Sequence, residues 1–207
     1  MNPNLLEIDK TFTEQYRSLL EIQKSVKAQL STYNFDLEKT EITDAIINRM
    51  DAFWYFNFNN NKELLNRNVN TTAADFFTET CLLFLKAYFE QKMGYKVCSE
   101  EVIAQNPVIR PDITIWKNEQ LIAVIELKVS NGWKGKFILP HLEEREKIIK
   151  ANHPTVYFGV LAFWNFFDTK NENWNTKYFG LRNIEKNNHF RTDARVEAMI
   201  RMVNEVI

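Results

Sequence analysis

Two short strands that carry charged residues constrain this chain more than any other feature. Residues 111–115 and 123–128 are apolar and rich in β-branched side chains, yet each run contains acidic groups. The polar residues 118–120 separate the two runs, which predicts an antiparallel hairpin centred on that break. Asp112 then lies opposite Glu126, and because side chains alternate between the faces of a strand, both point to the same face.

The same alternation adds Lys128 to that face, so one lysine and two carboxylates emerge together. Directly opposed residues have Cβ atoms roughly 5 Å apart, which lets Asp112 and Glu126 share one cation. Mg²⁺ takes oxygen ligands from one or two carboxylates and keeps water or phosphate oxygens as the rest. The alternative is a solvated cross-strand salt bridge, which contributes only about 0–1 kcal/mol.

Pro111-Asp112 followed by Glu126-Leu127-Lys128 resembles the PD-(D/E)xK nuclease superfamily, and the resemblance covers about residues 71–165. It implies an α/β protein with a restriction-endonuclease-like core, in which helices flank a mixed central β-sheet. It also implies a Mg²⁺-dependent phosphodiesterase, with Mn²⁺ as a substitute, that leaves 5′-phosphate products. We therefore expect a nuclease, most simply a DNA endonuclease of restriction or defence type.

The resemblance assigns roles to particular residues. Asp112, Glu126 and the backbone carbonyl of Leu127 would hold the metal, and Lys128 would orient the attacking water. The helix expected over residues 72–94 would supply Glu79 through a metal-bound water. Asp75 and Glu90 on the same helix are competing candidates for that role.

The segments after the motif add further candidates. Residues 129–136 form a turn-rich loop in which Lys134 and Lys136 are expected to contact phosphates, while Trp133 either stacks on a base or packs beneath the loop. A helix that begins at Pro140 follows. It is expected to point one polar side chain back to the site, and Arg145 and Glu144 are the candidates. The apolar run 155–163 predicts a buried strand beside the hairpin.

The net charge of −1 and the pI of about 6.3 provide no global basic field for nucleic acid. A local groove must then bind phosphates, and a C-terminal basic series offers further candidates. Arg195 and the run to Ile207 also fit an ordinary amphipathic helix. The members of the series are Lys177, Arg182, Lys186, Arg191, Arg195 and Arg201.

An Asn-rich stretch, residues 57–70, predicts a boundary between two parts of the chain. Residues 1–70 are expected to form a helical N-terminal extension packed on the core, and residues 71–207 the nuclease-like core. Apolar residues at helical spacing in the extension fit packing, dimerisation or target recognition. Cutting both strands of double-stranded DNA usually takes two active sites, so a homodimer is a further expectation.

Other function classes lack their sequence signatures. The chain has no glycine-rich phosphate loop, no Gly-x-Ser-x-Gly elbow and no His-Glu-x-x-His motif. Cys81 lies in an apolar helix and Cys98 at the end of a short expected strand, so both are expected to be buried thiols and not a disulfide. No apolar run approaches the ~18 residues of a membrane span, so we expect a cytoplasmic protein without membrane contact. The rival hypotheses are a nuclease-fold module that binds nucleic acid or a protein partner without catalysis, and a purely structural domain.

Overall fold

The computed structural model describes residues 4–67, 73–105, 107–167, 175–185 and 188–206, without the side chains of Trp133 and Lys134. The chain divides into two compact units, Met1–Asn34 and Phe35–Ile207. The first unit contains helix α1 (Leu5–Thr32), which has no buried residue. The second helix packs within the larger unit, so the division into compact units falls near residue 34, whereas the division at residue 70 stays a prediction.

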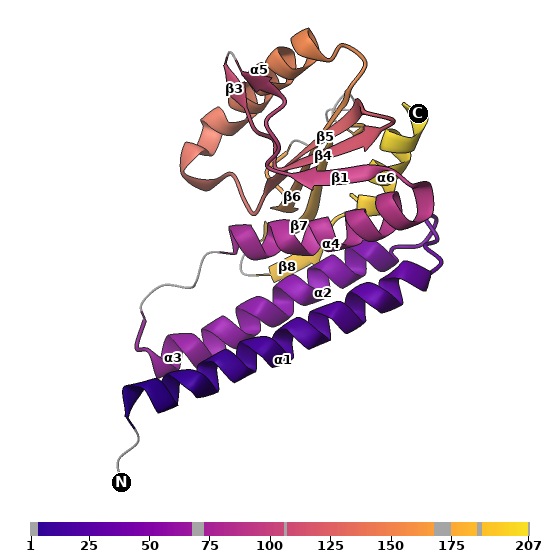
Figure 1. The fold of residues 1–207 in the computed structure, drawn as a ribbon. Helices are drawn as coiled ribbons and strands as arrows, with labels where there is room; N and C mark the ends of the chain where they lie inside the picture. Colours follow the sequence, from indigo (N-terminus) through magenta and orange to yellow (C-terminus); the bar gives the residue numbers. More distant parts are fainter. Residues whose placement is uncertain (1–3, 68–72, 106, 168–174, 186–187, 207) are drawn as a thin grey trace. The chain divides into compact units, whose positions relative to one another are not determined.

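The larger unit contains seven helical segments and eight strands within the described residues, and Figure 1 shows their order. The helical segments are α2 (Glu41–Phe56), the π-helical turn η1 (Asn57–Asn61), α3 (Lys62–Leu64), α4 (Ala74–Met93), α5 (Ile138–Asn152, preceded by the 3₁₀ turn η2, Gly132–Phe137) and α6 (Val196–Glu205). The strands are β1 (Lys96–Ser99), β2 (Ala104–Gln105), β3 (Val108–Ile109), β4 (Ile113–Lys117), β5 (Gln120–Lys128), β6 (Tyr157–Trp164), β7 (Tyr178–Glu185) and β8 (Asn188–Arg191).

Six strands form one mixed sheet in the order β1-β4-β5-β6-β7-β8. β5, β6 and β7 are parallel, whereas β1, β4 and β8 run antiparallel to their neighbours. Helix α5 covers one face through a core that includes Leu142, Val124 and Val160, and α4 lies against the other face (Figure 1). The structure thus confirms an α/β protein with a mixed central sheet flanked by helices, and β6 is the predicted buried strand beside the hairpin.

The predicted hairpin and its register are both present, although its turn is tighter than expected. Asn118 and Glu119 adopt positive φ angles of 47° and 66° and connect the strands as a two-residue turn. A β-bulge leaves Ile122 without a partner, so the pairing shifts by one residue to Ile113 opposite Ile125. This shift decides which face the charges occupy, because a one-residue slip would turn Glu126 to the other side.

The helix before the motif ends where the sequence predicts. Gly94 takes the left-handed conformation at φ 70°, and its N–H and that of Tyr95 donate to carbonyls of the last turn of α4. The helix begins at Ala74, two residues later than expected. It packs against α2, where Phe53 and Phe76 stack with ring centroids 4.5 Å apart.

The N-terminal segment contains two helices of opposite character. α2 buries Ile42, Ile46, Ile47 and Met50, which confirms packing onto the core for this helix. The Asn-rich stretch does not end α2 at once, because residues 57–61 continue it as a π-helical turn. No helix within the described residues is long and apolar enough to cross a membrane. Cys81 and Cys98 are free thiols, as predicted, but only Cys81 is buried, whereas Cys98 is half-buried.

Candidate active site

Asp112, Glu126 and Lys128 meet at the start of β4 and the end of β5, as the hairpin register requires. Lys128 Nζ lies 3.2 Å from Asp112 Oδ2 and 3.4 Å from Glu126 Oε2. The N–H of Leu127 also donates to Asp112 Oδ2 at 2.6 Å, which fixes that carboxylate against the strand. The sequence alone therefore predicted this cluster correctly.

The ammonium group of Lys128 contacts a third oxygen, the backbone carbonyl of Leu127, at 2.8 Å. Its three neighbours are thus one oxygen each from Asp112, Glu126 and Leu127, which are the three oxygens that the resemblance assigns to a metal. Oxygen donors around one positive charge are also the ligand type that Mg²⁺ and Mn²⁺ prefer. The donor set therefore fits a hard divalent cation.

Arg145 from α5 completes the cluster. Its Nε donates to Glu126 Oε1 at 2.6 Å, and its Nη2 donates to the carbonyl of Arg110 at 2.6 Å. One guanidinium thereby ties Glu126 to the segment that leads into Asp112. Of the two candidates on this helix, Arg145 reaches the site, whereas Glu144 is exposed and lies 3.8 Å from Lys147.

Glu126 is only 3% exposed, although it is ionisable. Burial raises the pKa of its carboxyl above the ordinary value, the nearby Asp112 carboxylate raises it further, and Lys128 and Arg145 offset only part of the rise. A buried ion pair is a poor source of stability, because desolvation opposes the attraction between the charges. A buried carboxyl with a raised pKa beside a hollow is therefore a candidate for function.

A groove of about 1020 Å³ opens beside the cluster, at the carboxyl ends of β5 and β6. Its charged end is lined by Asp112, Leu127 and Lys128, and the first turns of α4 line one side. Ligands of open α/β sheets bind outside the carboxyl ends of the strands, so the groove lies where a substrate is expected. A smaller hollow of about 320 Å³ borders the cluster near His141 and Arg145.

The expected acid on α4 is placed differently from the prediction. Glu79 is exposed and does not line the groove, whereas Asp75, one helical turn earlier, does line it. Glu90 accepts from Lys86 Nζ at 2.7 Å and from the N–H of Val97 at 3.2 Å, so it ties α4 to β1. The geometry thus favours Asp75 over Glu79 and Glu90 as the acid that α4 presents to the site.

The expected phosphate contacts have mixed outcomes. Lys136 is exposed, and its Nζ lies 5.2 Å from the ring centroid of Phe137. It does not line the groove, and the side chains of Lys134 and Trp133 lie outside the described residues. The loop therefore brings no described cation to the groove.

The C-terminal basic series is used within the protein. Lys177 pairs with Glu146 at 2.7 Å, Arg182 with Asp51 at 2.6 Å, and Arg191 with Asp44. Arg195 and Arg201 bind backbone carbonyls of residues 37–39, and Lys186 lies outside the described residues. The described members of the series thus all have partners within the protein, and none of them lines the groove. Helix α6 is the amphipathic helix that the sequence offered as the alternative.

Another part of the groove lining is aromatic, and the sequence alone did not bring its residues together. It consists of Trp54 and Tyr55 from α2, Phe58 from η1, Trp164 at the end of β6 and His189 from β8. We call these five residues the aromatic wall. The spacing of Trp54, Tyr55 and Phe58 beside exposed asparagines was the available indication, because it places several rings on a polar part of one helix.

Within the described residues, no group of three or more His, Cys, Asp or Glu side chains is arranged to hold a metal. The oxygen set above contains two carboxylates and one backbone carbonyl. Comparisons with models of known protein families, with curated proteins and with solved structures find no match to this chain. Functional inference therefore depends on the chemistry of the site itself.

Proposed function

We propose that this chain is a metal-dependent phosphodiesterase that cleaves nucleic acid, with a core of the restriction-endonuclease-like type. The observation that carries the proposal is the convergence of Asp112, Glu126 and the Leu127 carbonyl on one positive charge beside an open groove. Asp112, Glu126 and Leu127 would hold Mg²⁺ or Mn²⁺. When bound, such an ion polarises a phosphoryl oxygen and lowers the pKa of its water.

The protein's own residues have distinct tasks in this proposal. Lys128 places a fixed positive charge beside the reacting phosphate, which favours hydroxide over water as the nucleophile and stabilises the charge that develops on phosphate oxygens. Arg145 is a positioning residue, because it holds the Glu126 carboxylate and the Arg110 backbone in one geometry. Burial of Glu126 keeps bulk water away from one side of the site.

The first experiment incubates the purified chain with plasmid DNA, single-stranded DNA and RNA in Mg²⁺ or Mn²⁺, with EDTA as the blank. Lys128→Ala should lower the cleavage rate roughly 100- to 10,000-fold. Lys150→Ala is the matched control, because Lys150 also pairs with a glutamate, Glu146 at 2.7 Å, but lies outside the groove. A Lys128→Ala protein as active as the wild type would refute the proposed mechanism.

Metal binding separates the proposal from its rivals. Mg²⁺ or Mn²⁺ should raise the melting temperature of the wild type in a concentration-dependent way, and Asp112→Asn should abolish the shift. A metal shift without cleavage of any substrate would favour a binding module of the same fold. Absence of both would favour the structural alternative, in which Lys128 only closes a salt bridge with Asp112 and Glu126.

A further inference from the structure

The aromatic wall has no task in the phosphodiester chemistry, although it lines the same groove. Tyr55 is 70% exposed and Phe58 is 50% exposed, which is a large apolar surface for two neighbouring residues of a helix to present to water. Both residues point into the groove that contains Asp112 and Lys128. Exposed apolar surface that borders a hollow is characteristic of binding sites.

The base of the wall is fixed by packing. The ring of Trp54 lies 4.8 Å from that of the buried Phe163 and 5.8 Å from that of Trp164, at an interplanar angle of 29° for the second pair. Trp164 in turn contacts His189, with ring centroids 4.6 Å apart. The wall therefore has a base of rings in mutual contact, one pair stacked and the others edge-on, and Tyr55 and Phe58 add exposed rings to it.

The groove lining carries little positive charge for binding phosphates, although Lys62 lies beside it, with Nζ 4.5 Å from the centroid of the Phe58 ring. Among the described residues that line it, Lys128 is the sole lysine or arginine, whereas Asp51, Asp75, Glu100 and Asp112 are acidic. Arg182 compensates Asp51 alone, at 2.6 Å. A ligand that contains phosphate must therefore gain most of its affinity from another part of the molecule.

The bases of a nucleic acid can supply this affinity if their faces are free to stack. Stacking on aromatic side chains tolerates any base, because every base has a π-face. In a duplex those faces are covered by neighbouring base pairs, and protein side chains reach them only in single strands or in extruded nucleotides. The wall therefore matches unpaired nucleotides and has no equivalent use with an intact double helix.

We propose that the groove binds an unpaired stretch of nucleic acid, with bases stacked on the aromatic wall and the chain directed toward Asp112 and Lys128. This inference rests on the proposed nuclease function and narrows its substrate from double-stranded DNA to single strands or unpaired segments. Stacking rather than charge then supplies the affinity. The logarithm of the binding constant should fall with the logarithm of salt concentration at a slope on the order of −1, as for one or two neutralised phosphates.

The test measures binding of fluorescently labelled 12-nucleotide oligo(dT), oligo(U) and a hairpin duplex to the wild-type protein in EDTA, which withholds the metal for cleavage, by anisotropy. Under these conditions, Tyr55→Ala and Phe58→Ala should each weaken binding of the single strands roughly 5- to 150-fold. Phe190→Ala is the matched control. Phe190 is 43% exposed and neighbours His189 on β8, but its side chain points to the opposite face of the strand and does not line the groove.

Equal binding of the duplex and the single strands would overturn the inference, and so would unchanged binding in Tyr55→Ala and Phe58→Ala. The oligo(dT) and oligo(U) arms distinguish DNA from RNA as the source of the unpaired bases. Failure here is separable from failure of the nuclease proposal. Metal-dependent cleavage that requires Lys128 but not the aromatic wall would support the nuclease proposal and contradict the stacking proposal. Binding of single strands through the wall, without cleavage in any metal, would support the binding site and contradict the nuclease proposal.

Discussion

Glu126 and Glu197 are buried to nearly the same extent, but their hydrogen-bond partners differ in kind, since Arg195 Nε lies 4.0 Å from Glu197 Oε2, beyond hydrogen-bond distance. Glu197 is fully buried at the start of α6, and its Oε1 accepts from the N–H groups of Ile42 and Thr43 at 2.7 and 3.1 Å. Its Oε2 accepts from the Thr43 hydroxyl at 2.6 Å. Glu126, by contrast, is bonded to the long cationic side chains of Lys128 and Arg145.

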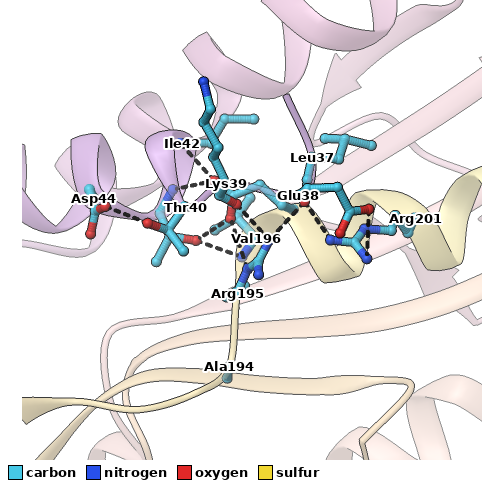
Figure 2. Close-up of polar contacts among 12 residues, drawn as sticks. Leu37, Glu38, Lys39, Thr40, Ile42, Asp44, Ala194, Arg195, Val196 and Arg201 are labelled. Atoms are coloured by element: carbon cyan, nitrogen blue, oxygen red, sulfur yellow. Dashed lines mark hydrogen bonds and ion pairs between the residues drawn. The ribbon is translucent and has the colours of Figure 1, made fainter. Parts of the chain in front are cut away.

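Glu197 therefore acts as the cap that α2 lacks in its own sequence. Thr40 stands at the N-cap position without a side-chain hydrogen bond to the helix, so free N–H groups of the first turn take their acceptor from a residue 154 positions away. Figure 2 shows this end of α2, where Arg195 and Arg201 also donate to the carbonyl of Leu37. A carboxylate near the positive end of a helix dipole is stabilised there.

The comparison teaches that burial alone does not identify a functional carboxylate. Backbone N–H groups of a helix cannot leave Glu197 without unfolding α2, so its role is structural. Lysine and arginine side chains can exchange partners, so the oxygens around Glu126 are available to another cation. The kind of donor, rather than the depth of burial, separates the two residues.

The largest effect is expected for Glu197→Ala. The change leaves two N–H groups and the Thr43 hydroxyl buried without their acceptor, at roughly 1–3 kcal/mol for each group. The free energy of unfolding, measured by urea denaturation, should fall by on the order of 4 kcal/mol. Glu205→Ala, at an exposed position of the same helix, is the control and should change it by less than about 0.5 kcal/mol. A loss for Glu197→Ala as small as that of the control would break the comparison.

Glu126→Gln should show the opposite profile. Glutamine keeps the shape of the side chain but removes a charge, so metal-dependent cleavage should fall at least roughly 100-fold. The free energy of unfolding should change by no more than about 1 kcal/mol, because the raised pKa of Glu126 means that the folded state already disfavours the charged form of this carboxyl. Glu146→Gln is the matched control, since Glu146 also bonds two lysines, Lys150 and Lys177, but lies outside the groove. Equal activity of the two variants would count against Glu126 as a ligand.

Arg145→Lys tests the positioning of Glu126 with a smaller change. Lysine keeps the charge, but a single ammonium cannot repeat the planar fork that joins Glu126 to the Arg110 carbonyl. The affinity for Mn²⁺, measured by calorimetric titration, should fall roughly 10- to 100-fold, as is typical when the partner of a metal ligand is lost. Arg191→Lys, in a pair with Asp44 away from the groove, should leave the affinity unchanged. Wild-type affinity in Arg145→Lys would show that Glu126 needs no such support.

The charged end of the groove was predictable from sequence because it depends on local rules. Strand alternation and one hairpin register bring Asp112, Glu126 and Lys128 together within 17 consecutive residues. Even here two deviations compensate each other, since the tighter turn and the bulge at Ile122 restore the expected pairing. A short segment with a strong pattern fixes its own geometry.

The aromatic wall and the Glu197 cap were not predictable in the same way. Trp54 and Trp164 are brought together by packing on Phe163, and Glu197 meets Thr43 across 154 positions. No periodicity in a single sequence encodes such contacts between distant segments. The sequence could not decide between Glu79 and Asp75 for the same reason. The side of α4 that faces the groove depends on how the helix packs on α2 and the sheet.

The smallest effect, and the last test of the comparison, is the pH dependence of stability in EDTA. The folded protein holds the pKa of Glu126 above its ordinary value of 4.5, chiefly through burial, so between those two values the folded state binds more protons than the unfolded state. Stability should therefore fall as pH rises through this window in the wild type but not in Glu126→Gln. For Glu146 burial opposes ionisation, but hydrogen bonds from Lys150 and Lys177 hold its pKa below the ordinary value, so its contribution is lost as pH falls. For each glutamine variant, urea denaturation across this pH range gives the difference in unfolding free energy from the wild type. Plotted against pH, this difference should have opposite slopes for Glu126→Gln and Glu146→Gln. Slopes of the same sign would contradict the distinction between Glu126, whose charged form is disfavoured, and Glu146, whose charged form is favoured.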